Sequence, residues 1–283
     1  MRTACQLTLP SILAVSVVLA GCDSTAPDED ETEPTFTLVA ADRDGDFYTI
    51  DEATGVETLF LDTSTDDGFD GTTDVGVVSS MHYIPSTQEW WLGTGGNAEC
   101  AGCIQTLNLT TGLATTLADV QNGVSGLAVH PTTGKIYTFE SDGTDEIYEI
   151  DATTGVYTTL FTGLGMQNGG TGTTFSLSEV LYVAPRGELY TVDLSNGTPT
   201  LIGALTYTGF PAFTQTSQTI GSLATRPSDG VVFGILKDGG NSGNLQPTFL
   251  VTVDLATAEV TNVGAHTQLM DGLAFIMTSL ISP

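Results

Sequence analysis

Short apolar segments separated by turn residues run through most of the chain. Between residues 126 and 161, four of them follow one another and are separated by runs such as PTTG and ATTG. Each is five or six residues long and rich in β-branched and aromatic side chains, which is typical of β-strands and too short for helices. The pattern predicts strands over residues 126–130, 136–140, 146–151 and 156–161.

The third and fourth segments belong to a phrase, such as IYEIDATTGVYTTL, that occurs five times. The spacings between its equivalent acids or amides are 57, 43, 42 and 61 residues, at Asp51, Asn108, Asp151, Asp193 and Asp254. The shortest spacing fits the ~40–50 residues of one four-stranded propeller blade. The Asp or Asn can accept hydrogen bonds from turn amides, and the glycine after it supplies the positive φ of a tight hairpin. We therefore interpret the phrase as strand 3, a turn and strand 4 of a blade, rather than as a ring of ligands.

The two ends of the repeat complete each other. Residues 271–277 (DGLAFIM) match the first strand of a blade but have no further strands behind them, whereas the first phrase lacks such a strand. The C-terminal strand would become the innermost strand of the N-terminal blade and remove an open sheet edge. The predicted fold is an all-β, five-bladed propeller of four-stranded antiparallel blades over residues 35–283.

The N-terminus has a different pattern. Arg2 precedes a mostly apolar segment over residues 7–19, which is too short to span a bilayer comfortably. The segment ends in LAGC, which resembles the lipobox of bacterial lipoproteins and implies diacylglycerol on Cys22. We predict a lipoprotein signal peptide over residues 1–21, an acidic disordered tether over residues 22–34, and lipid anchoring in the bacterial envelope, on its periplasmic or cell-surface side. An ordinary secretory signal with an accidental cysteine is the alternative.

The phrase I/L-Y-x-I/V-D-x-x-T-G also resembles the repeats of PQQ-like, YVTN and NHL-type propellers over residues 36–277. Quinone-dependent dehydrogenases of that broad class carry tryptophan motifs around the repeat, whereas this chain has two tryptophans, Trp90 and Trp91. The resemblance thus implies the fold and not the quinone chemistry. We expect the two indoles to point to opposite faces of one strand and to pack between blades.

The net charge limits the possible partners, and the cysteine content indicates a disulfide. With 34 acidic and 6 basic residues the formal net charge is -28. Such a charge repels phosphate groups, so nucleic acid is excluded as a partner. Solubility in salty surroundings explains the excess of acidic residues. Cys100 and Cys103 predict a loop disulfide in an exported protein. A redox-active pair is the alternative, although such a pair normally stands at a helix N-terminus.

The lengths of the loops indicate which face of the propeller binds a ligand. The connections within strand pairs 1–2 and 3–4 are short and the others are long, so all long loops share one face of the propeller. We predict that this long-loop face of a monomeric domain binds a protein or a glycan. Residue His82 stands near the axis, where the other blades have Ala128, Ser176, Ala224 and Ala274. The binding candidates are Asp66, Asp67, Asp70, Phe210, Phe213 and His82.

Two alternatives use the acidic residues. Ca²⁺ is the one cofactor for which the sequence offers ligands, on Asp62, Asp66, Asp67 and Asp70, and a solvated acidic loop explains the same residues. A glycosidase-like hydrolase would need two carboxylates ~5–10 Å apart, for which Asp74 and Asp271 are the candidates. Neither a P-loop nor a Ser/His/Asp grouping is present in the sequence, so a binding role is the main hypothesis and catalysis the alternative.

Overall fold

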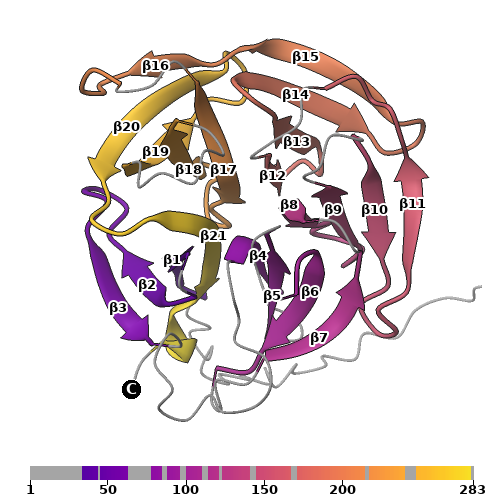
Figure 1. The fold of residues 1–283 in the computed structure, drawn as a ribbon. Coiled ribbons are helices and arrows are strands. Elements are labelled where there is room, and N and C mark those ends of the chain that lie inside the picture. The colour runs from indigo at the N-terminus through magenta and orange to yellow at the C-terminus, as the bar shows by residue number, and fades with distance from the viewer. Residues whose placement is uncertain are drawn as a thin grey trace, which may run out of the picture. The chain divides into compact units, whose positions relative to one another are not determined.

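The computed structural model describes residues 34–43, 45–62, 78–84, 88–95, 100–109, 114–120, 123–140, 145–166, 171–213, 217–239 and 247–281. They form five antiparallel sheets around a common centre, a five-bladed β-propeller (Figure 1). The predicted fold class is confirmed. The predicted signal peptide, Cys22 and nearly all of the predicted tether lie outside the described residues.

Each blade runs from an innermost strand 1 to an outer strand 4. Blade 1 consists of β21 (Met270–Met277), β1 (Phe36–Asp42), β2 (Phe47–Ile50) and β3 (Glu57–Leu61). Blade 2 consists of β4 (Val78–Ile84), β5 (Glu89–Thr94), β6 (Cys103–Leu107) and β7 (Ala114–Asp119). Blade 3 consists of β8 (Val124–Val129), β9 (Ile136–Glu140), β10 (Ile147–Ile150) and β11 (Tyr157–Phe161).

Blades 4 and 5 differ in strand number. Blade 4 consists of β12 (Gly172–Phe175), β13 (Leu181–Ala184), β14 (Glu188–Asp193) and β15 (Thr198–Ala204). Blade 5 consists of β17 (Gln218–Thr225), β18 (Val232–Asp238), β19 (Thr248–Val253) and β20 (Glu259–Ala265), with a fifth strand, β16 (Thr206–Thr208), parallel to β20. Sequence reasoning assigned residues 207–219 to a loop. The chain leaving blade 4 instead extends the outer edge of blade 5 before it enters the centre.

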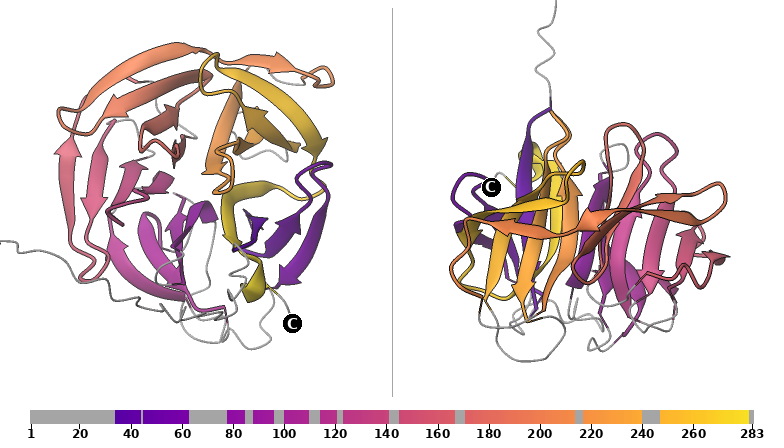
Figure 2. Two further views of the ribbon diagram at one scale, coloured as in Figure 1. Left: turned by 180° about the vertical axis from the view of Figure 1, so that it is seen from behind. Right: turned by 90° about the horizontal axis from the view of Figure 1, so that it is seen from above.

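The ring closes as predicted. β21 pairs along its length with β1, from Phe36↔Met277 to Asp42↔Met270, and so supplies the innermost strand of blade 1. In Figure 1 the yellow C-terminal strand lies beside the indigo N-terminal ones. Seen from the side, the strands run from one face of the ring to the other, so their connections emerge on two opposite faces (Figure 2).

The core consists of five apolar clusters, one at each interface between neighbouring blades. Both faces of a blade are therefore buried, which explains the near-continuous apolar runs of the inner strands. Trp90 belongs to the cluster between blades 1 and 2, edge-on to Phe47, and Trp91 to the cluster between blades 2 and 3. The prediction that the two indoles point to opposite faces and pack between blades is confirmed.

The recurring phrase forms the predicted hairpin. The Oδ1 atom of Asp151 accepts hydrogen bonds from the backbone N–H groups of Thr153 and Thr154, at 3.0 and 2.8 Å, and Asp51 does the same in blade 1. These bonds, the one from the Thr154 amide first, lower the pKa of Asp151. The turn role of the acid is confirmed.

The same turn also joins neighbouring blades, which the sequence did not reveal. A Cβ atom at Gly155 would overlap the carbonyl oxygen of Leu117 in β7 of blade 2. In the fifth phrase Ala258 replaces the glycine at φ 61°, and the adjacent strand of blade 4 has Gly203 opposite it. Glycine is thus favoured at this position for two reasons: it adopts the positive φ, and it lets the two backbones approach closely.

Helical structure is confined, in the described part of the chain, to one 3₁₀ turn, η1 (Thr278–Leu280). No helix there is long and apolar enough to cross a membrane.

Candidate functional site

The candidate site is a cavity at one mouth of the central channel. The five inner strands all run in the same direction, and the cavity lies at their C-terminal ends, beside the short turns that lead from strand 1 to strand 2. We call this end the short-turn mouth and the opposite end, toward the long connections, the long-loop mouth.

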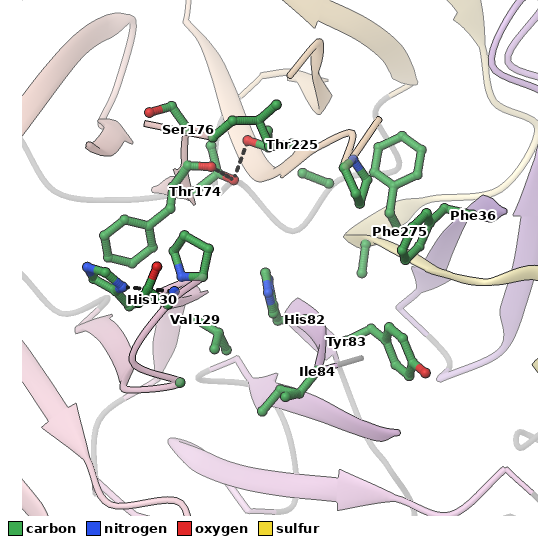
Figure 3. Close-up of a pocket in the computed structure, with 18 of the residues that line it drawn as sticks. Phe36, His82, Tyr83, Ile84, Val129, His130, Thr174, Ser176, Thr225 and Phe275 are labelled. Carbon is green, nitrogen blue, oxygen red and sulfur yellow. Dashed lines mark hydrogen bonds between the residues drawn. The ribbon is translucent and has the colours of Figure 1, made fainter. Parts of the chain in front are cut away.

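All five blades contribute to a volume of about 500 Å³. Figure 3 shows His82 near the middle, with Phe275 and Phe36 on one side and His130 on the other. Aromatic and aliphatic side chains dominate the walls, among them Phe36, Tyr83, Ile84, Val129, Phe175, Leu177 and Phe275. A mostly apolar cavity of this size is typical of sites for small ligands.

A few polar groups interrupt the apolar walls. The hydroxyl groups of Thr174 and Thr225, from blades 4 and 5, are hydrogen-bonded to each other at 2.9 Å across the cavity wall (Figure 3). The Nδ1 atom of His130 accepts hydrogen bonds from the backbone of Thr132 and Thr133, both at 3.3 Å. This fixes the orientation of His130, whose ring lies 5.0 Å from that of Phe175.

The cavity is electrically neutral in a strongly acidic protein. Among the described residues, its lining contains no Asp, Glu, Lys or Arg. Burial lowers the pKa of His82 to about 4, because a charged imidazole is poorly solvated there. At neutral pH His82 is therefore an uncharged hydrogen-bonding group at the centre of the site.

The position of His82 near the axis agrees with the sequence analysis, but one of its equivalents was wrong. His82 pairs with Trp91, and the matching pairs in blades 3 and 4 are Ala128 with Tyr137 and Thr174 with Tyr182. Thr174, and not Ser176, therefore occupies the level of His82 in blade 4. β12 ends at Phe175, two residues earlier than the alignment of the repeats assumed.

The long-loop mouth has the opposite chemistry. The buried Asp, Glu and Lys residues of the described part are all at this end, namely Asp42, Asp46, Glu140, Lys237, Asp238 and Asp271. Lys237 of blade 5 forms an ion pair with Asp271 of blade 1, and Arg43 Nε lies 3.4 Å from the second oxygen of that carboxylate. Gly221 of β17 leaves the space that the Lys237 side chain occupies.

This arrangement bears on the proposed catalytic pair. Both oxygens of Asp271 are engaged by cations, so neither can attack or protonate a substrate without breaking an ion pair. Its candidate partner, Asp74, lies outside the described residues. The geometry therefore offers Asp271 a structural role in joining blades 5 and 1.

Of the acidic binding candidates on the long-loop side, the structure describes only Asp62. Asp66, Asp67 and Asp70 lie outside the described residues, and Asp62 is exposed at the end of β3. Among the residues that the structure describes, no three His, Cys, Asp or Glu side chains converge as metal ligands do. The Ca²⁺ hypothesis stays a prediction about residues 62–70.

Phe210 and Phe213 are not free aromatics at the channel. They are half-buried and pack with Tyr207, at ring distances of 5.9 and 5.3 Å, against the cluster between blades 4 and 5. Phe210 also contacts Phe249 edge-on. The added strand β16 pairs with the outer strand of blade 5, so these two rings are half-buried against that blade, and their part in binding stays a prediction.

Cys100 and Cys103 are joined by a disulfide in the connection between β5 and β6, with their Cα atoms 5.6 Å apart. Cys103 opens strand β6, and its backbone N–H donates to Thr94 Oγ1 at 2.8 Å. The pair stands at the start of a strand and not at a helix N-terminus, which favours the structural reading over redox chemistry.

Sequence reasoning missed most of the cavity. Thr174, Thr225, Phe275 and Phe36 received no functional role, because the search followed loop length to the opposite face. The available signal was weak: strand 1 ends in bulky or hydroxylated residues in blades 1, 4 and 5, at Phe275, Phe175 and Thr225.

Comparisons with known proteins leave the family open. No protein-family model matches the chain, and no curated protein matches it in sequence. Solved structures match at low identity. The extracellular domain of a proposed hybrid two-component system from Bacteroides thetaiotaomicron is 14% identical, with a TM-score of 0.46 over 83% of this chain and 28% of that one.

Two further matches are similar in quality. Hydrazine synthase from Kuenenia stuttgartiensis is 14% identical, with a TM-score of 0.42 over 69% of this chain and 51% of that one. A structural-genomics protein of unknown function from Bacteroides thetaiotaomicron is 11% identical, with a TM-score of 0.48 over 80% and 54%. The chain spans little more than half of these structures at most, and ligand and activity must be argued from the site itself.

Proposed function

We propose that this protein is a binding module that holds its ligand in the cavity at the short-turn mouth. The observation that carries the proposal is a cavity of about 500 Å³ to which all five blades contribute and whose described lining has no Asp, Glu, Lys or Arg. Apolar walls supply affinity by removing ligand surface from water, and His82, Thr174 and Thr225 supply the few polar groups that orient a ligand. The described walls are those of a binding pocket, mostly apolar with a few hydrogen-bonding groups, and this chemistry supports a binding role.

The N-terminal sequence supports a location for this module. An apolar segment ending in LAGC at residues 19–22 and an acidic stretch after it support lipid attachment at Cys22 and a tether that holds the domain outside the cytoplasm. Mass spectrometry of the protein from a bacterial host should find an N-terminal diacylglyceryl cysteine, and Cys22→Ser should release the protein from membranes. An unlipidated N-terminus in the wild type would disprove the anchor.

A second surface is proposed for a macromolecular partner. The described strand ends that border the long connections lie on the long-loop side, and this asymmetry in connection length supports contact there with an envelope protein or glycan. Replacing residues 63–77 by a short turn should leave the propeller folded and reduce capture of that partner from envelope extracts. Full retention of capture would disprove a role for that loop.

The cavity itself can be tested with a neutral probe. 4-Phenylbutan-1-ol has an apolar body and one hydroxyl, and we expect saturable binding to the purified chain by ligand-observed NMR. His82→Trp fills the centre of the cavity and should weaken binding at least about tenfold, which corresponds to about 1.4 kcal/mol. Thr225→Phe obstructs the cavity from blade 5 and serves as a second variant if His82→Trp fails to fold. Unchanged binding in both folded variants would overturn the proposal.

A further inference from the structure

A second cavity adjoins the first on the short-turn face. It has a volume of about 360 Å³ and lies over blade 4, lined by Glu179, Val180, Leu181, the end of β14 and its turn (residues 191–195), and Thr200. His130 lines both cavities. The hydroxyl of Thr132, which lines the first cavity, donates a hydrogen bond to Glu179, which lines the second. One extended molecule can therefore contact both.

The two cavities differ in charge. Of the lining residues that the structure describes, the first cavity has no Asp, Glu, Lys or Arg, whereas the second has Glu179 and Asp193 and no Lys or Arg. Asp193 is held in its turn by Ser195 and Asn196, and the hydrogen bond from the Ser195 hydroxyl first of all lowers the pKa of this carboxyl. Both acids therefore bring negative charge to a cavity beside a neutral one.

Neither acid is neutralised by a nearby cation. Within the described ranges, no Lys or Arg lies within ion-pair distance of Glu179 or Asp193. The basic residues near the same face are used elsewhere, since Lys135 pairs with Glu149 and Arg226 with Glu52 and Asp229. Glu179 is also exposed and has φ 64°, a conformation that is unfavourable for a residue other than glycine.

We infer that the ligand of this site is an amphiphilic organic cation, with its apolar body in the first cavity and its amine beside Glu179 in the second. The inference rests on the proposed function, because it requires a ligand in the first cavity. The net charge of -28 acts in the same direction, since it raises the local concentration of cations near the surface.

Three probes of one shape test the inference. 4-Phenylbutylamine, 4-phenylbutan-1-ol and 4-phenylbutanoate differ in charge and share the apolar body. In calorimetric titrations with the purified chain we expect the amine to bind about five-fold tighter than the alcohol, as a partly exposed ion pair allows, and the carboxylate to bind most weakly. Glu179→Gln should bring the amine close to the alcohol while leaving the affinity for the alcohol unchanged.

A matched control separates local recognition from the general field of an acidic protein. Asp62→Asn removes one exposed charge on the long-loop side and should leave the ratio of amine to alcohol affinity unchanged. Equal losses of that ratio in Glu179→Gln and Asp62→Asn would overturn the inference, as would equal affinities for amine and alcohol in the wild type. Either result leaves the proposed function standing if the alcohol still binds in a His82-dependent way. Binding of neither probe would overturn both.

Discussion

The two mouths of the channel are built from opposite ends of the same inner strands, and they differ in what they bury. The long-loop mouth buries Asp271 and Lys237 as an ion pair that joins blade 5 to blade 1. The short-turn mouth buries the neutral His82 among apolar walls around an open volume. Buried charges must be paired, and here each charge engages the other, so Asp271 and Lys237 hold two blades together rather than bind a ligand. The neutral mouth holds polar groups that a ligand can still satisfy.

The largest expected effect on stability comes from removing one charge of the ion pair at the long-loop mouth. Lys237→Met leaves Asp271 buried with only Arg43, which is 31% exposed, as its partner. We expect the free energy of unfolding to fall by about 3–5 kcal/mol in urea titrations, with binding of the neutral probe to the other mouth unchanged while the chain is folded.

The matched control is the double variant Lys237→Met, Asp271→Leu, which replaces the pair by apolar groups. Because a buried ion pair offsets its own desolvation only partly, we expect the double variant to recover most of the lost stability. A single variant that loses less than about 1 kcal/mol would show that the pair does not hold the joint.

Away from the channel, the outer turns on the short-turn face make close backbone contacts with the neighbouring blade, which a second change tests. Gly155→Ala combines positive φ (69°) with an overlap onto Leu117 of the neighbouring blade, and we expect a loss of about 3 kcal/mol. Gly134→Ala is the control, because Gly134 has φ 67° and open space around it. It should lose only about 1 kcal/mol. Equal losses of stability in the two variants, measured by thermal unfolding, would mean that the contact between blades does not contribute to stability.

The disulfide at the long-loop side should have a smaller effect. Cys100 and Cys103 close a loop with a sequence separation of 3, for which chain entropy gives at most about 2 kcal/mol. Reduction of the wild type should lower the thermal midpoint by a few degrees, and the variant Cys100→Ala, Cys103→Ala should not respond to reductant. A midpoint that is the same with and without reductant in the wild type would argue against the bridge.

At neutral pH the smallest effect is expected from His82, because its titration changes the stability only as the pH falls below about 6.5. Its folded-state pKa of about 4 lies below the unfolded value of ~6.5. Between these values the unfolded chain binds more protons, so stability is lost as the pH falls through this range. His82→Gln should flatten the pH dependence of the unfolding free energy between pH 6.5 and 4, relative to the wild type. Parallel curves for the two proteins would show that His82 is not desolvated.

Local patterning predicted the blades well, because every blade repeats the same short-range signals. The alternation of apolar segments and turns located the strands of blade 3 to within two residues, with β9 at Ile136–Glu140 as expected. The phrase marked the hairpins because its Asp and Gly act on their own turn. Errors arose where a partner outside the blade decided the outcome, as for Thr206–Thr208, which pairs with β20 of the next blade.

The amino-acid sequence by itself determined the number of blades, the closure by Met270–Met277 and the turn role of the recurring Asp, since the repeated pattern shows how often the blade recurs and which strand the first blade lacks. Only the tertiary structure decided where a site exists. His82, Thr174, Thr225 and Phe275 are separated by one or two blade lengths of chain, at ~40–50 residues per blade, and no local signal connects them. They meet because the ring brings the ends of all five inner strands to one mouth, and there apolar walls and a few polar groups create a cavity that no single blade contains.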